Sequence, residues 1–198
     1  MVGLGNPGRS YEGTRHNVGA EAVLLLAARR GLSLKRERGT TSIVTKLPLD
    51  ACVMVVAIPQ TWMNECGIAV RALVDRHLSA REDDDDTLLH RLVVVHDELD
   101  LPPGQVKVKV AGGTAGHNGL KSIRSHLHSS EFARVRVGVG KPPNPARGAS
   151  YVLARPPGRE REALELAKQD AADAVEVVMS EGLAAAMTRF NSTKHQPR

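Results

Sequence analysis

The chain has 198 residues, 41% of them hydrophobic and 25% charged, so it is long enough and apolar enough to bury the core of one large domain. It contains no run of about eighteen apolar residues that would span a membrane and no hydrophobic leader at the N-terminus. Its two cysteines exclude a disulfide-stapled secreted fold, and we expect a cytoplasmic protein without a membrane partner.

Alternating patterns predict strands and helices in turn along the chain. Strands are predicted at residues 1–4, 41–46, 52–58, 91–96, 106–110 and 134–139, and helices at 17–30, 66–78, 120–127 and 158–182, with a shorter helix after the last. This order predicts an α/β fold, a single-domain three-layer α/β/α sandwich over residues 1–198 around a mixed, mostly parallel twisted sheet. The tail from about residue 191 is expected to be flexible.

Three segments between or within these elements carry further expectations. The strand at 134–139 alternates strictly, which predicts that Arg134 and Arg136 point outward while its valines point inward. Residues 81–86, with four consecutive aspartates, are expected to form a solvated loop. Residues 141–147 are expected to form a proline-rich loop.

Positive charge is concentrated in one segment. Residues 105–141 contain seven cations and one anion, a net charge of +6, whereas the whole chain has +5. The cations are Lys107, Lys109, Lys121, Arg124, Arg134, Arg136 and Lys141. This excess favours a polyanionic partner such as a nucleic acid over an ordinary solvated surface.

The spelling Gly3-Leu4-Gly5-Asn6-Pro7-Gly8 imitates the glycine fingerprint of a dinucleotide-binding loop. In such a loop the third glycine leads into a helix whose amides hold a pyrophosphate. Here Pro7 removes one amide, and no apolar stripe at helical spacing begins before Asn17. An acidic residue for the ribose is also missing, apart from Glu37 inside a basic run. We therefore reject a dinucleotide-binding site, and with it a dehydrogenase.

Four polar clusters follow predicted strands. They are Asn6, residues 60–64, residues 97–100 and residues 112–118. Active sites of α/β proteins gather at the carboxyl ends of strands, so we expect these clusters to converge.

His16 and Asp97 are the candidate catalytic pair. Histidine is the side chain best suited to accept a proton near neutral pH, and a carboxylate at the end of a buried strand can orient an imidazole and stabilise its charged form. Taken singly, His16 is more typical of a helix cap or a surface position than of a base, and Asp97 is also typical of an N-terminal cap or a loop-closing residue.

Three asparagines and two aromatic residues are candidates for substrate contacts. Asn6, Asn64 and Asn118 each follow a predicted strand, and carboxamides can both donate to an oxyanion and accept from a peptide N–H. Trp62 and Tyr11, in polar loops, can stack on a base or ribose or can simply pack. The loop at 112–119, preceded by Lys107 and Lys109, can meet a phosphate.

Other hydrolytic chemistries have little support. The serine elbow Gly-x-Ser-x-Gly is absent, Cys52 lies in a predicted core strand, and nothing pairs Cys66 with a base. His96, Glu98 and Asp100 make only a thin case for a metal, and we expect neither a metal nor a cofactor. Attack by a histidine-activated water is the simplest hydrolytic scheme.

Taken together, these blocks resemble the bacterial-type peptidyl-tRNA hydrolase family over nearly the whole chain. The similar stretches are Val2-Gly3-Leu4-Gly5-Asn6-Pro7-Gly8, Tyr11, Thr14-Arg15-His16-Asn17-Val18-Gly19, Pro59-Gln60-Thr61-Trp62-Met63-Asn64, His96-Asp97-Glu98-Leu99-Asp100-Leu101-Pro102-Pro103-Gly104, Gly116-His117-Asn118-Gly119-Leu120-Lys121 and the strand at 134–140. The blocks stand in the family's order, and the combination is far more specific than any single glycine motif.

The resemblance implies a monomeric enzyme, without an obligate protein partner, that cleaves the ester between a peptide and the 3′ ribose of tRNA. It implies His16 as the base, Asp97 as its stabilising carboxylate, and Asn6 as the residue that recognises the acylated amino group. It also implies that the substrate site includes Tyr11, Trp62, Met63, Asn64, His117 and Asn118, and that tRNA phosphates are held by Lys107, Lys109 and Arg136. Which of Asn64 and Asn118 orients the water stays open.

The chain departs from the family pattern in several places, among them the four-aspartate run, residues 141–158 and the C-terminal helices. Its first strand is short, since only one residue precedes Val2, and Trp62 stands where the family more often has a smaller aromatic residue. A catalytically inactive RNA-binding protein on the same fold is the rival hypothesis, against which His16, Asp97 and the three asparagines argue.

Overall fold

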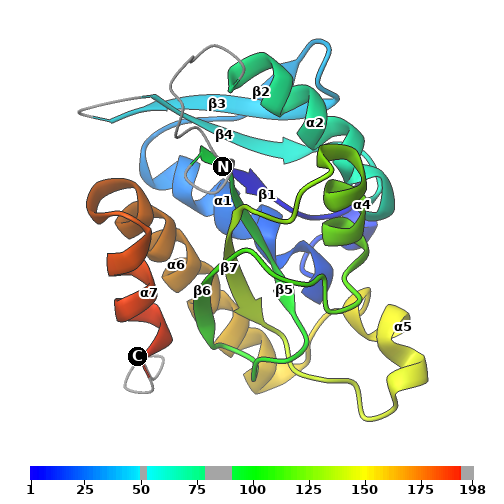
Figure 1. Ribbon diagram of the computed structural model, residues 1–198. Helices are drawn as coiled ribbons and strands as arrows, with labels where there is room; N and C mark the ends of the chain where they lie inside the picture. The colour runs from blue at the N-terminus through cyan, green and yellow to red at the C-terminus, as the bar shows by residue number, and fades with distance from the viewer. Residues whose placement is uncertain (50–52, 79–90, 193–198) are drawn as a thin grey trace.

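The fold is built on one seven-stranded sheet. The structure, a computed structural model, describes residues 1–49, 53–78 and 91–192. Within these residues the strands follow the order β2-β3-β4-β1-β5-β7-β6 (Figure 1). They are β1 (Val2–Gly3), β2 (Lys35–Glu37), β3 (Ser42–Pro48), β4 (Val53–Pro59), β5 (Val93–Glu98), β6 (Val106–Val110) and β7 (Ala133–Gly138).

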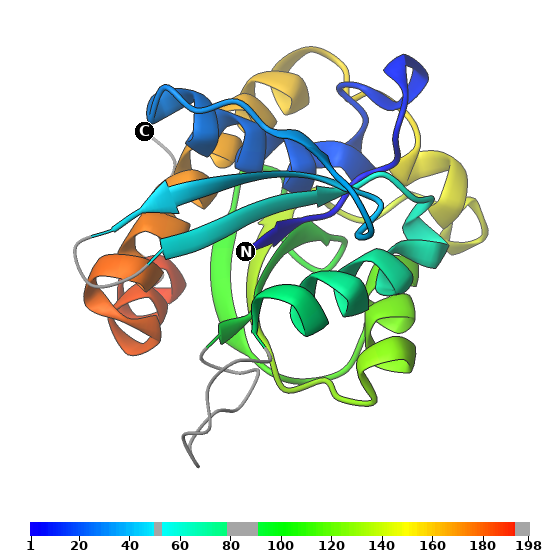
Figure 2. The same ribbon diagram turned by 90° about the horizontal axis from the view of Figure 1, so that it is seen from above.

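Helices cover both faces of the sheet. They are α1 (Val18–Arg29), α2 (Cys66–His77), α4 (Asn118–Leu127), α5 (Gly148–Val152), α6 (Gly158–Glu181) and α7 (Leu183–Asn191), with 3-10 turns η1 (Arg9–Tyr11), η2 (Arg15–Asn17), η3 (Met63–Glu65) and η4 (Pro145–Arg147). Figure 2 shows the sheet between α1 and α6 on one side and α2 and α4 on the other. The three-layer α/β/α sandwich expected from the sequence is confirmed. No helix among the described residues has the length and apolarity to cross a bilayer.

The sheet is mixed, as predicted, with parallel pairing at its centre. The strands β4, β1, β5 and β7 run parallel, while β2, β3 and β6 pair antiparallel at the two flanks. The carboxyl ends of the four parallel strands therefore share one edge. The carboxyl end of β6 lies at the opposite edge, since Val110 pairs with Ala133 at the start of β7. The loop after β6 therefore runs back along the molecule to reach the edge at which the four parallel strands end.

The observed elements differ from the predicted ones mainly in short segments. Neither β2 nor α5 was predicted, because the polar residues of β2 and the five residues of α5 carry no usable periodicity. Strand β5 continues through Glu98, so that Asp97 lies within the strand. The predicted loop at 81–86, the first residue of the strand at 52–58 and the end of the tail lie outside the described residues.

The outward orientation expected for Arg134 is wrong. Its side chain is only 3% exposed, and its guanidinium donates to the carbonyl oxygens of Gly112 and Gly113, each at 2.6 Å. The loop that returns from β6 covers this face of β7 and buries the arginine. Burial lowers the pKa of Arg134. Arg136 keeps the expected face but is half-buried, because it pairs with Glu98 at 2.9 Å.

Each face of the sheet has its own hydrophobic core. One joins the sheet to α1, α6 and α7 through residues such as Leu26, Val135 and Ala171. The other joins it to α2 and α4 through residues such as Val70 and Ile123. The two cores fix the helices on the central parallel strands and so fix the loops at their carboxyl ends.

Gly19 allows α1 to lie directly on β5. A Cβ atom at this position would stand 2.2 Å from the carbonyl oxygen of Val95. Any larger side chain would push the helix away from the strand. His16, three residues before Gly19, reaches Asp97 because of this close approach.

We expect Gly19→Ala to lower the free energy of unfolding by about 1–3 kcal/mol through overpacking, and to separate His16 from Asp97. Chemical denaturation measures the first effect. Gly113→Ala is the control, because a Cβ there meets nothing within 4 Å. Equal stability of the two variants would contradict the assigned packing.

Candidate active site

His16 stands at the entry to α1, at the carboxyl edge of the sheet. It belongs to η2 and is 8% exposed. Its Nδ1 atom lies 2.9 Å from Oδ1 of Asp97, so the carboxylate accepts the Nδ1–H proton. The lone pair of the neutral imidazole is then on Nε2, the atom that remains to accept a proton from a bound molecule.

Asp97 accepts a second hydrogen bond on the same oxygen. The Nε2 atom of His117 also lies 2.9 Å from Oδ1 of Asp97. The aspartate is 3% exposed, and burial by itself would raise the pKa of its carboxyl. The two imidazoles outweigh burial and hold this pKa well below its usual range. Asp97 is therefore a carboxylate at every working pH.

His117 is locked in one neutral tautomer by its second role as the N-cap of α4. Its Nδ1 accepts hydrogen bonds from the main-chain N–H groups of Gly119 and Leu120 at 3.1 and 3.3 Å. The proton therefore sits on Nε2, directed at Asp97. A proton on Nδ1 would point at these two main-chain N–H groups, which are themselves donors. Positive charge that develops in the cluster consequently belongs to His16.

His96 completes the cluster from beneath and was not assigned a role from the sequence. It is 1% exposed, and its Nδ1 lies 2.7 Å from the carbonyl oxygen of Asp97. Its ring packs edge-on against His117 with centroids 5.0 Å apart. Burial lowers the pKa of His96 to about 3. The His96 ring is therefore neutral, and it packs against the ring of His117.

A cavity of about 210 Å³ opens beside this cluster. It is lined by His16, Asp97, Glu98, Leu99, Ala115, Gly116, His117, Asn118, Gly148, Ala149 and Val152. Four of the predicted site residues thus share one cavity: His16, Asp97, His117 and Asn118. Its α5 wall was missed, because glycine, alanine and valine carry no chemical signal in a sequence.

Asn6 does not line the cavity, but it ties together the turns that follow β1 and β4. Its Oδ1 accepts the main-chain N–H of Met63 at 2.8 Å, and its own main-chain N–H and C=O pair with the side chain of Asn17 at 2.9 Å each. The Nδ2 group of Asn6 has no partner among the described residues. Met63 is 4% exposed, so its side chain belongs to the core.

The aromatic candidates, the half-buried Tyr11 and the exposed Trp62, form a pair outside the cavity lining. Tyr11 and Trp62 pack edge to face with ring centroids 5.7 Å apart, and 49% of Trp62 is exposed. Asn64 is exposed on η3 in the same neighbourhood. The predicted residues therefore divide into a cavity group and a group on the adjoining surface.

The basic candidates lie on the outer strands. Lys107 pairs in register with Arg136, and Lys109 with Arg134, so all four side chains share one face of the sheet. Lys109 is exposed and Lys107 half-buried. Within the described residues neither lysine has a hydrogen-bond or ion-pair partner. The face is positively charged, although Arg134 belongs to the interior.

The geometry also argues against a dinucleotide-binding loop and against a metal site at His96, Glu98 and Asp100. The Asn6 amide is occupied by Asn17, and only the 3-10 turn η1 follows Gly8, so the glycine turn has no pyrophosphate cradle. Glu98 pairs with Arg136 and Asp100 with Lys141, so these acids do not converge with His96.

Among the described residues, the ligand atoms of His16, Asp97 and His117 do come within 4.8 Å of one another, as in a possible metal site. Their 2.9 Å nitrogen–oxygen distances are those of hydrogen bonds, and the capped tautomer of His117 keeps its proton between Nε2 and the carboxylate.

A buried imidazole–carboxylate pair at the carboxyl edge of an α/β sheet, facing a cavity, is typical of α/β enzymes that use general-base catalysis. Comparison with known proteins identifies the family. The model of the peptidyl-tRNA hydrolase family matches residues 1–198. The chain belongs to this family.

Individual relatives agree over nearly full length. The chain is 45% identical to the peptidyl-tRNA hydrolase of Cutibacterium acnes, covering 97% of each chain, and 42% identical to that of Chloroflexus aggregans, covering 96% of this chain and 97% of the relative. A crystal structure of the Acinetobacter baumannii enzyme matches with a TM-score of 0.87 and 32% identity, covering 100% of this chain and 95% of that one.

The depressed pKa of His96 gives stability a pH dependence. A group whose pKa is about 3 when folded and 6.5 when unfolded binds its proton only in the unfolded chain between these values. The free energy of unfolding should therefore fall as the pH is lowered from 6.5, by up to about 1.4 kcal/mol per pH unit. We expect His96→Asn to flatten this slope above pH 4. Denaturant titrations between pH 4 and 7 measure it, and parallel curves for the two proteins would contradict the assignment.

Proposed function

We propose that this protein hydrolyses the ester that joins a peptide to the 3′ ribose of tRNA, releasing free tRNA and recycling it from aborted translation. The single observation that carries the proposal is the free Nε2 of His16, facing a cavity while Asp97 holds Nδ1. Membership of the peptidyl-tRNA hydrolase family supplies the substrate class.

The geometry supports a general-base mechanism. Nε2 of His16 takes a proton from a water, whose oxygen attacks the ester carbonyl carbon to form a tetrahedral oxyanion. Asp97 stabilises the imidazolium, while His117 stays neutral and fixes the carboxylate. When the carbon–oxygen bond to the ribose breaks, the imidazolium returns its proton to the leaving 3′ oxygen. The products are a peptide acid and tRNA with a free 3′ hydroxyl.

The asparagines divide the remaining tasks. Asn118 lines the cavity and is the donor available to the oxyanion or the water, whereas Asn64 lies on the adjoining surface. The open Nδ2 group of Asn6 points to recognition of a peptide carbonyl, which would favour peptidyl-tRNA over aminoacyl-tRNA. Met63 serves by fixing Asn6 through its main chain.

The surface beyond the cavity suits the 3′ end of tRNA. Tyr11 and the exposed ring of Trp62 offer stacking faces for a terminal base, and Lys107, Lys109 and Arg136 offer charge to backbone phosphates. Action as a cytoplasmic monomer is part of the same proposal, and size-exclusion chromatography with light scattering tests the oligomeric state.

Substitution of the catalytic pair tests the chemistry. We expect His16→Ala and Asp97→Asn each to lower kcat by about a hundredfold or more while tRNA affinity stays within a few-fold. Release of labelled peptide from peptidyl-tRNA is the measurement. His128→Asn, on an exposed histidine outside the site, is the matched control. Binding of tRNA without peptide release by the parent protein would favour the inactive RNA-binding alternative.

Substitution of the basic face tests the phosphate contacts. Each of Lys107→Ala and Lys109→Ala should weaken tRNA binding and reduce the slope of log affinity against log salt by about 1 if the lysine contacts one phosphate. Binding is measured by fluorescence anisotropy with deacylated tRNA at several salt concentrations. Lys46→Ala, an exposed lysine on β3, should leave the slope unchanged. Identical slopes in all four proteins would remove the lysines from the interface.

A further inference from the structure

Arg15, the residue before His16, is a buried arginine with a full set of partners outside the cavity. It is 5% exposed, and its Nε and Nη2 atoms donate to the two carboxylate oxygens of Glu160, in the first turn of α6. Its Nη1 donates to the main-chain oxygens of Tyr151 and Ala154, each at 3.1 Å. Its guanidinium also stacks on the ring of Tyr151, 4.0 Å from the centroid.

One of these bonds ends on Tyr151 in α5, the helix that forms one wall of the catalytic cavity, and another ends on Ala154, two residues beyond α5. The helix has five residues, of which only Val152 is buried, so it lacks a core of its own. Its last carbonyl groups face the positive charge of Arg15, which suits the negative end of a helix. The hydroxyl of Tyr151 donates to the carbonyl oxygen of Val139 at 2.7 Å and gives α5 one further anchor.

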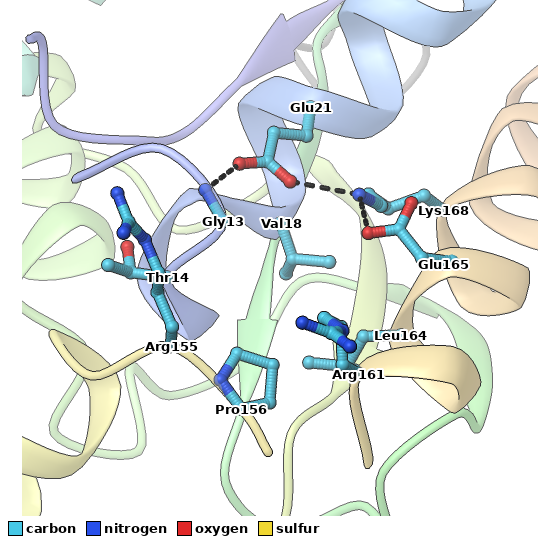
Figure 3. A pocket seen from close by; sticks show the side chains of 10 residues that line it. All are labelled: Gly13, Thr14, Val18, Glu21, Arg155, Pro156, Arg161, Leu164, Glu165 and Lys168. Atoms are coloured by element: carbon cyan, nitrogen blue, oxygen red, sulfur yellow. Dashed lines mark hydrogen bonds and ion pairs between the residues drawn. The ribbon is translucent and has the colours of Figure 1, made fainter. Parts of the chain in front are cut away.

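The other side of the same junction is shown in Figure 3. A separate cavity of about 100 Å³ lies there between residues 13–21 and the start of α6. Glu21 accepts the main-chain N–H of Gly13 at 2.7 Å and the ammonium of Lys168 at 3.0 Å, and Arg155 lies beside Thr14. These contacts join the segment before His16 to α6. Arg15 extends this junction to the end of α5, through its side chain and through its main-chain N–H, which donates to the carbonyl oxygen of Ala154 at 3.3 Å.

We propose that Arg15 is a positioning residue, which fixes α5 relative to His16 and so sets the shape of the cavity that holds the substrate ester. The inference rests on the proposed function. Arg15 does not line the catalytic cavity, and none of its bonds involves His16, Asp97 or His117. Its loss should therefore loosen the substrate wall without changing the base and its carboxylate.

Kinetics separate this role from a catalytic one. We expect Arg15→Lys to lower kcat/KM about tenfold and Arg15→Ala about a hundredfold, mainly through KM, because α5 is displaced while the proton-transfer pair stays in place. The acidic limb of the pH–rate profile should stay where it is in the parent. Millimolar methylguanidinium should restore part of the activity of Arg15→Ala by filling the vacated site.

Hydrogen exchange provides a readout that does not depend on activity. Amides of residues 148–154 should exchange at least about tenfold faster in the Arg15 variants, while those of β5 keep the protection of the parent. Glu160→Gln should give a milder effect in the same direction, because it removes the charge that orients the guanidinium. Arg159→Ala removes an exposed cation from the same turn of α6 and is the matched control. It should leave both readouts unchanged.

The outcomes are distinct. If Arg15→Ala fails to fold, Arg15→Lys and Glu160→Gln carry the test. A KM within twofold of the parent in folded Arg15 variants, a shifted acidic limb, a general loss of exchange protection or no response to methylguanidinium would each overturn the assignment. A parent protein that releases no peptide would refute the proposed function and this inference with it. An active parent with unaffected variants would refute the inference alone.

Discussion

One carboxylate oxygen organises the functional end of this protein. Oδ1 of Asp97 accepts N–H groups from two imidazoles at 2.9 Å in a place almost closed to solvent. A buried carboxylate with fewer donors would be costly, and here two donors outweigh the desolvation and keep the group ionised. Because both bonds are needed, the positions of η2, β5 and α4 are coupled through a single atom.

The two imidazoles are not equivalent, and their difference follows from the backbone. The amides at the start of α4 occupy Nδ1 of His117 and leave it one tautomer. His16 has no such constraint on Nε2 and faces the cavity. One histidine can therefore change its charge during a reaction while the other holds the carboxylate. In the proposed mechanism, a helix cap, which usually contributes only to stability, decides which nitrogen performs the chemistry.

The two walls of the cavity differ in how firmly they are packed. His16, Asp97 and His117 come from elements packed on the central strands, and the close contact of Gly19 with Val95 leaves them little freedom. The opposite wall, α5, is short and nearly coreless, and it is attached through Arg15 and Tyr151. The catalytic residues are thus held by the packing of the core, whereas α5 is held by a few side-chain bonds.

The sequence by itself determined the alternation of strands and helices, because long amphipathic and apolar segments depend on local periodicity. It also marked His16 and Asp97 as candidates, because their residue types and flanking motifs carry chemical meaning. It rejected the dinucleotide reading from Pro7, the absence of a helical stripe before Asn17 and the missing acidic residue. Only the tertiary structure decided that Arg134 is interior, that the loop after β6 crosses from the far edge, and that α5 closes the cavity. These depend on strand direction and on contacts between residues far apart in the chain, such as Arg15 and Glu160. Local sequence patterns do not encode these features, because the contacts that stabilise them form only when distant parts of the chain come together.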